Sequence, residues 1–183
     1  SEVETILEDL RRLLEELKKH SDEVVKEIKD LLREIEKHTR EVVKTSKKLL
    51  KELEELRKRG DLREEELERA VEESSKLVED DEREIRKMLK RIEDLVRENK
   101  DKLRRAVEEV ERKVRELKRR LKDKEELVRK IEKVLKEVRE TIKKIAEDSD
   151  RVLEEAKEVA KRLKDESDRV NEEVRKRIEE LKK

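Results

Sequence analysis

The feature that most constrains this chain is an apolar stripe with a regular repeat. The segment LKKHSDEVVKEIKDLL at 17–32 recurs as IEKHTREVVKTSKKLL at 35–50, where Ile35, Val42, Val43, Leu49 and Leu50 repeat the apolar residues Leu17, Val24, Val25, Leu31 and Leu32. Eighteen residues, the offset between the two segments, make about five turns of a straight α-helix, so the stripe returns to the same angle without the supercoil that a strict heptad imposes. The repeat therefore predicts long, nearly straight helices.

The composition agrees with long helices. Of 183 residues, 60% are charged and 31% are hydrophobic, no aromatic residue, proline or cysteine occurs, and Gly60 is the one glycine. This usage is typical of long helices built from Ala, Glu, Lys, Leu and Arg. The 55 basic and 55 acidic residues cancel, and the apolar residues are periodic, which separates the chain from disordered sequences of high net charge.

The charge pattern also bears on location and partners. No apolar run is long enough to cross a membrane, and the N-terminus lacks the apolar core of a secretory signal. We therefore expect a soluble chain without a targeting signal, suited to recombinant cytoplasmic expression. Interleaved charges give no basic stripe for phosphates, and no Trp or Phe anchors a helix in lipid, so neither nucleic acid nor membrane is an expected partner.

The first helix boundary is marked by a glycine. The first helical signal covers 2–58 and stops before Gly60, a residue suited to the left-handed position just past a helix end. Asp61, with Glu64 three residues later, resembles a capping box and is expected to cap the next helix.

The second boundary rests on a cap and a change of phase. Asp123 with Glu126 repeats the capping-box arrangement without a glycine. The 18-residue apolar stripe also changes phase there, from the set that contains Leu103 and Leu121 to the set that contains Leu127 and Ile145. We expect one domain over 1–183, an all-α, elongated up-down-up bundle of three nearly straight helices. The expected helices are 2–58, 62–121 and 124–182, with turns near 59–61 and 122–123.

Polar residues interrupt the apolar stripe of every expected helix. Folding the chain about the two turns brings them to matching heights, so each finds polar partners on the other helices. A buried polar group without a partner costs about 1 to 3 kcal/mol, so this many are tolerable only if they bond to one another. We predict three layers: His20, Ser21, Asn99 and Ser149; His38, Thr39, Asp81 and Ser167; and Thr45, Ser46, Ser74, Ser75 and Asn171. Their expected effect is to fix helix pairing and register, because a slipped helix would place them against Leu and Val.

A catalytic, metal-binding or receptor-binding role is less consistent with the pattern than this structural one. The second layer has the residue types of a nucleophile, base and orienter, but a continuous helical core offers no oxyanion site or pocket, so no catalytic residue is expected. His20 and His38 lie about 27 Å apart along one helix, too far to share a metal ion. Arg59, Gly60 and Asp61 spell the tripeptide that integrins recognise, yet turn chemistry alone explains them. No cofactor is expected.

The 18-residue stripe, the equal helix lengths, the Gly60–Asp61 turn, the KKHSDEVVKEI style of surface and the polar layers resemble computationally designed helical bundles with buried hydrogen-bond networks. Spectrin repeats are similar in topology but carry Trp and other aromatic residues, which this chain lacks. The resemblance implies a monomeric structural scaffold with no natural ligand or enzymatic activity. An interaction module that associates in trans, as a homo-oligomer or with designed partner helices, is the alternative. A natural spectrin-like or coiled-coil linker is a more distant one.

Overall fold

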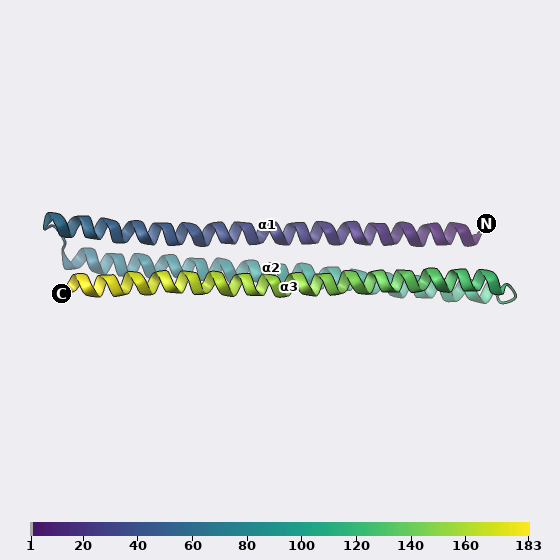
Figure 1. Cartoon of the computed structure of the whole chain (residues 1–183). Helices are drawn as coiled ribbons and strands as arrows, with labels where there is room; N and C mark the ends of the chain where they lie inside the picture. The colour runs from purple at the N-terminus through teal and green to yellow at the C-terminus, as the bar shows by residue number, and fades with distance from the viewer. Residues whose placement is uncertain (1) are drawn as a thin grey trace. The chain divides into compact units, whose positions relative to one another are not determined.

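The computed structural model describes residues 2–183 and contains three long helices joined by two short turns (Figure 1). Helix α1 spans Glu2–Arg59, α2 spans Glu64–Arg120 and α3 spans Glu125–Lys182. They contain 58, 57 and 58 residues, and no strand occurs among the residues that the structure describes. The predicted all-α class and three-helix bundle are confirmed. The turn near Asp123 is present, so the second and third helices are not continuous.

Charges at the helix ends favour these three helices. The first turn of α2 carries Glu64, Glu65 and Glu66, and the last turn of α1 carries three basic residues. Acidic groups near a helix N-terminus and basic groups near a C-terminus interact favourably with the helix dipole, by about 0.3 to 1 kcal/mol each. The ends are therefore stabilised by the sequence itself, apart from any packing between helices.

Helix α1 ends in a Schellman motif at Gly60. The Asp61 N–H donates to the Leu56 carbonyl at 2.9 Å, and the Gly60 N–H donates to the Arg57 carbonyl at 3.1 Å. These two bonds satisfy carbonyls that the end of a helix leaves without partners. Gly60 has a φ of 75°, in the left-handed region where a side chain is strained, so the role predicted for this glycine is confirmed.

Replacing Gly60 by alanine should lower the free energy of unfolding by about 1 kcal/mol. No atom lies within 4 Å of a Cβ built at this position, so the cost comes from backbone strain and not from a clash. Urea unfolding of the variant measures it. Gly60→Asn is the control and should cost less, because asparagine tolerates the left-handed region; equal losses in the two variants would argue against backbone strain as the cause.

Helix α2 begins two residues later than expected. The Arg63 carbonyl accepts the first helical bond, from the Leu67 N–H at 3.4 Å, so Arg63 and not Asp61 occupies the cap position. The prediction that Asp61 caps α2 is therefore wrong. The reason is hydrophobic packing. Leu62, just before the cap, packs against the cluster containing Leu67, and the two residues have the spacing of a hydrophobic staple.

Helices α2 and α3 are joined by a turn without glycine. The Lys124 N–H donates to the Leu121 carbonyl at 3.0 Å, and the Lys124 carbonyl then accepts the first bond of α3, from the Val128 N–H at 3.2 Å. Lys124 is thus at the cap position, and Asp123, predicted to cap α3, lies one residue before it. No non-glycine residue in the described chain has a positive φ, so the reversal uses conformations open to any residue.

The contacts of the chain divide it into two compact units. The first combines residues 2–28 with Ile92–Glu154, and the second combines Lys29–Arg91 with Glu155–Lys183. Each unit therefore contains a part of all three helices and one of the two turns. No helix in the described chain has the length and apolar character to cross a membrane.

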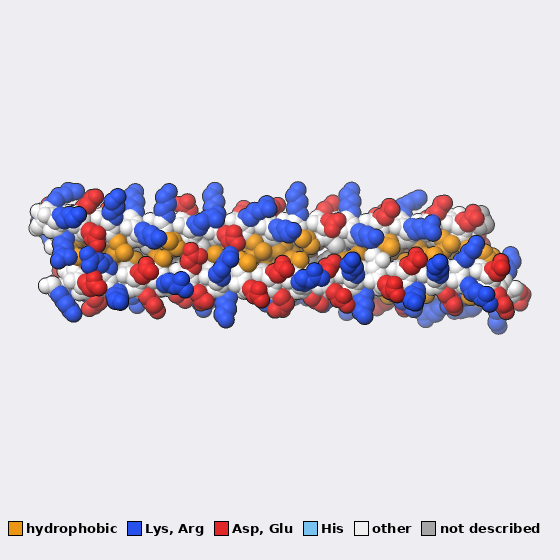
Figure 2. Space-filling view, viewed as in Figure 1, with side chains coloured by type: hydrophobic (Ala, Val, Ile, Leu, Met, Phe, Trp, Pro, Cys, Tyr) orange, Lys and Arg blue, Asp and Glu red, His pale blue; other side chains and the backbone are white. Residues whose placement is uncertain are grey.

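Each unit has its own aliphatic cluster. In the first unit, Val110, Val114 and Ile131 are almost completely buried; in the second, Val174 and Ile178 are buried with Leu53. Figure 2 shows lysine, arginine and acidic side chains over the outer faces of the helices, with hydrophobic side chains visible only along the seams. No large hydrophobic side chain is fully exposed among residues 2–183. The amphipathic stripe thus faces inward in both units.

Candidate functional site

The candidate site of this molecule is its set of buried polar side chains. Eight polar or charged residues in the described chain are buried, and they come from all three helices. They are Ser21, Thr39, Ser46, Ser74, Asp81, Asn99, Ser149 and Ser167. All eight belong to the predicted layers.

In the first unit, one asparagine connects the three helices. The Asn99 amide nitrogen on α2 donates to Ser21 Oγ on α1 at 3.1 Å and to Ser149 Oγ on α3 at 3.2 Å. Its carbonyl oxygen lies 3.5 Å from Ser21 Oγ, which donates to it. Both N–H groups of the amide are used, so this one side chain is hydrogen-bonded to both of the other helices in the unit.

The second unit contains a buried carboxylate. Asp81 on α2 is 0% exposed, and its oxygens accept bonds from Thr39 Oγ1 at 3.0 and 3.2 Å. His38 Nδ1 lies 2.6 Å from Asp81 Oδ1, while the histidine side chain is 42% exposed. The two α1 side chains together satisfy a carboxylate that would otherwise be costly to bury.

A third polar contact joins α2 and α3 in the same unit. Ser74 Oγ donates to Asn171 Oδ1 at 3.1 Å. Ser75, the next residue, is half-buried and accepts from the Arg175 guanidinium at 3.1 Å, at the surface. Of the five residues predicted for the third layer, the structure brings only Ser74 and Asn171 together, and Asn171 is half-buried.

The differences from the predicted layers follow a simple rule of helix geometry. Eight of the thirteen predicted residues form four adjacent pairs, and neighbours on a helix point about 100° apart, so one residue of each pair faces the core more directly. Ser21 is buried while His20 is half-buried and bonds to no described residue; Ser46 is buried while Thr45 is exposed. The predictions that place His20 and Thr45 in the layers are therefore wrong. His38 also lies at the edge of the buried face of α1, but its side chain is long enough to reach Asp81.

Two of the buried serines have no partner. The hydroxyls of Ser46 and Ser167 are buried and make no hydrogen bond within the described chain. The predicted layers gave each of them partners, and the structure does not. A buried hydroxyl without a hydrogen bond costs less than a buried charge without a partner. It still lowers the free energy of unfolding by about 1 kcal/mol.

A second carboxylate contact lies beside the Asp81 layer. The hydrogen bond between Glu82 on α2 and Asp168 on α3 raises the pKa of Glu82 above its ordinary 4.5. Partial burial and the charge of Asp168 act in the same direction, while Lys164 and Arg86 oppose them. Glu82 therefore keeps its proton to a higher pH than an isolated glutamate does.

Replacing Glu82 by glutamine should remove a loss of stability that appears as pH rises. Because its folded pKa is raised, Glu82 contributes most favourably below 4.5, and this contribution is lost as pH climbs from 4.5 through the folded value. We expect Glu82→Gln to gain stability relative to the parent at pH 7 and not at pH 4, measured by urea unfolding. Glu84→Gln, an exposed neighbour, is the control and should show no such dependence. A gain independent of pH would contradict the raised pKa of Glu82.

Surface contacts between helices were not among the sequence-based expectations. Arg177 on α3 donates to Glu54 on α1 at 2.9 Å and to Glu180 at 2.8 Å, and its bonds to Glu180 and Glu54 raise the pKa of Arg177. With charges at most surface positions, the sequence offers no signal that selects these partners from their neighbours. Such surface pairs contribute little to stability, because water and salt screen their charges.

Comparison with protein-family models and with curated proteins gives no match. A solved structure described as a "Computationally designed three helix bundle" matches at 23% sequence identity, covering 98% of this chain and 79% of that chain, with a TM-score of 0.40.

Proposed function

We propose that this chain is a designed structural scaffold in which the buried polar residues specify how the helices pair. The observation that carries the proposal is the Asn99 amide, which bonds to a serine on each of the other two helices of its unit. A helix shifted by one turn would lose these bonds and place a polar group against aliphatic side chains. The regular apolar repeat and the uniform helices support a designed origin.

A non-enzymatic role is part of the proposal. The residue types that suggest catalysis are Thr39, His38 and Asp81, but Thr39 and Asp81 are 0% exposed. A substrate therefore has no access to the hydroxyl or to the carboxylate that would orient the histidine. No group of three or more acidic or histidine side chains in the described chain is arranged to hold a metal ion. The contacts of this cluster instead join α1 to α2.

The scaffold proposal includes the chain acting as a monomer. Each unit already contains segments of all three helices, so no second chain is needed to cover its core. Sedimentation should give the monomer mass of 22.3 kDa at micromolar concentration. A dimer or trimer mass would favour the alternative, a module whose helices associate in trans.

The pairing role is tested by spin labels on exposed positions of the first unit. Labels at Lys18 on α1 and Lys102 on α2 report the register of the two helices around the Asn99 layer. The parent should give one narrow distance distribution. A variant with Ser21→Ala, Asn99→Leu and Ser149→Ala should keep its helicity and give a broader or shifted distribution. An unchanged narrow distribution would show that aliphatic packing alone sets the register, against the proposal.

A further inference from the structure

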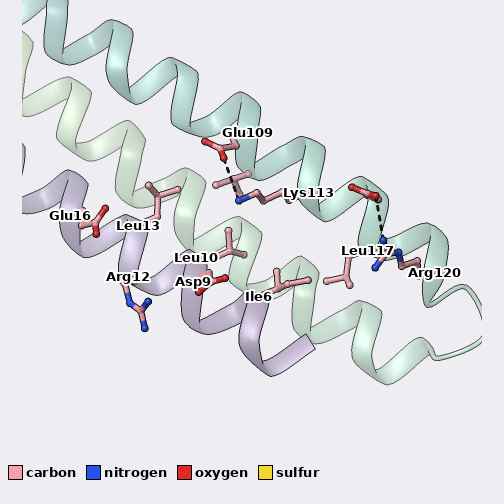
Figure 3. Close-up of a pocket in the computed structure, with 12 residues that line it drawn as sticks. Ile6, Asp9, Leu10, Arg12, Leu13, Glu16, Glu109, Lys113, Leu117 and Arg120 are labelled. Carbon is pink, nitrogen blue, oxygen red and sulfur yellow. Dashed lines mark hydrogen bonds and ion pairs between the residues drawn. The ribbon is translucent and has the colours of Figure 1, made fainter. Parts of the chain in front are cut away.

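The first unit contains a groove outside the polar layers. It lies between the N-terminal part of α1 and the C-terminal part of α2 and has a volume of about 440 Å³ (Figure 3). Its floor is apolar: Leu10, Val110 and Leu117 are buried core residues, and Ile6 and Leu13 are only partly buried. Ile6 and Leu13 are two helical turns apart, so they share one side of α1 and leave apolar surface in water.

The two rims of the groove differ in how their charges are used. On α2, Lys113 pairs with Glu109 at 3.3 Å, and Arg120 pairs with Glu116 at 3.5 Å. Figure 3 shows the pair of Lys113 and Glu109 as a dashed line on α2. The α1 rim carries Asp9, Arg12 and Glu16, which make no hydrogen bond or ion pair with any described residue. The α1 rim therefore presents an acidic, basic, acidic pattern that is open to a partner.

We propose that this groove binds one amphipathic helix of another protein. The helix places leucine or isoleucine on Ile6 and Leu13 and presents a cation, an anion and a cation to Asp9, Arg12 and Glu16. The α1 lining covers 6–16, about three turns or 16 Å, the length over which a helix sets anchors at i, i+4 and i+7. This site is independent of the scaffold role, because it uses none of the polar layers.

The open charges favour a different protein over a second copy of this chain. An antiparallel two-fold contact through this rim sets Asp9 against Glu16 of the other copy and Arg12 against itself. A parallel two-fold contact sets each charge against its own copy. Both arrangements oppose like charges, which costs affinity and suppresses self-pairing. A helix with the inverse pattern meets no such repulsion.

Two labelled synthetic peptides, each about five helical turns long, test the proposal. Both carry leucines at heptad spacing; one presents Lys, Glu and Lys along its rim, and the other presents Glu, Lys and Glu. In fluorescence anisotropy with the full chain at low salt, we expect the first peptide to bind at least about tenfold more tightly, with a smaller ratio at high salt. Equal binding of the two peptides, or no binding of either at 0.5 mM, would overturn the proposal.

Variants of the groove locate the binding. Leu13→Glu should abolish binding, while the matched Leu14→Glu, a partly buried neighbour that does not line the groove, should leave it unchanged. Reversing the three exposed rim charges, with Asp9→Lys, Arg12→Glu and Glu16→Lys, should invert the preference between the peptides, and it keeps the test decisive if Leu13→Glu unfolds. A preference unaffected by the reversal would contradict the assignment. A dimer lost on rim reversal would assign the groove to a second copy instead.

Discussion

Replacing Asn99 by leucine should lower the free energy of unfolding by about 2 to 3 kcal/mol, because two buried hydroxyls lose their partner at once. Ser21 Oγ and Ser149 Oγ each accept one N–H of this amide, and all three residues are buried. Leucine keeps the branched outline of asparagine and is somewhat larger, so the change removes the bonds without leaving a cavity. Urea unfolding followed by circular dichroism measures the loss.

The matched control removes the whole layer. A variant with Ser21→Ala, Asn99→Leu and Ser149→Ala leaves no polar group without a partner, so it should recover most of the stability lost by Asn99→Leu. Exposed Glu98→Gln, the neighbouring residue, should change the free energy of unfolding by less than about 0.5 kcal/mol. A triple variant that is less stable than the single one would mean that the hydroxyls bond elsewhere.

The helices could be predicted from the sequence because their signals are local. An apolar stripe with an 18-residue period, a glycine and a change of phase each act within a few turns of one helix. Gly60 is an example, because its freedom to adopt a positive φ follows from its lack of a side chain. The cap positions were not predicted correctly, since the packing of Leu62 against the core decides where α2 begins.

The polar site could be predicted only in part. The heights of Ser21, Asn99 and Ser149 follow from the turns, and the structure brings these three side chains together. Within an adjacent pair such as Thr45 and Ser46, a rotation of about 100° decides which residue is buried, and a broad apolar stripe does not resolve it. Bonding also depends on the reach and direction of each side chain, which spacing does not give.

The contact between Glu82 and Asp168 could not be found from the sequence for a different reason. Acidic residues occupy so many surface positions that no pattern selects this pair, and it was not among the predicted residues. The pKa of Glu82 is raised only when α2 and α3 pack side by side in the second unit. The same holds for the partners of Arg177. These contacts between charged side chains depend on the tertiary structure and cannot be inferred from the periodicity of the sequence.

The His38 contact leads to the largest expected effect of a single substitution. Replacing His38 by leucine should lower the free energy of unfolding at pH 7 by about 3 kcal/mol, because it removes one partner of a fully buried carboxylate. Thr39 Oγ1 is then the one side-chain donor left to Asp81 in the described chain. Since a buried charge with too few donors is costly, the cost falls on the second unit. Hydrogen exchange at pH 7 should show faster opening there than in the first unit.

Removing the charge along with its partners is the decisive comparison. The combined variant His38→Leu, Thr39→Val and Asp81→Leu buries aliphatic groups of similar shape and should be at least as stable as the parent, because a buried charge and its partners contribute little net stability. Lys37→Leu, an exposed position one residue away, controls for added hydrophobicity and should have little effect. A harmless His38→Leu would indicate that Thr39 alone satisfies Asp81. A combined variant less stable than His38→Leu would show that the polar cluster itself stabilises the unit, so that its contribution would be energetic as well as a matter of register.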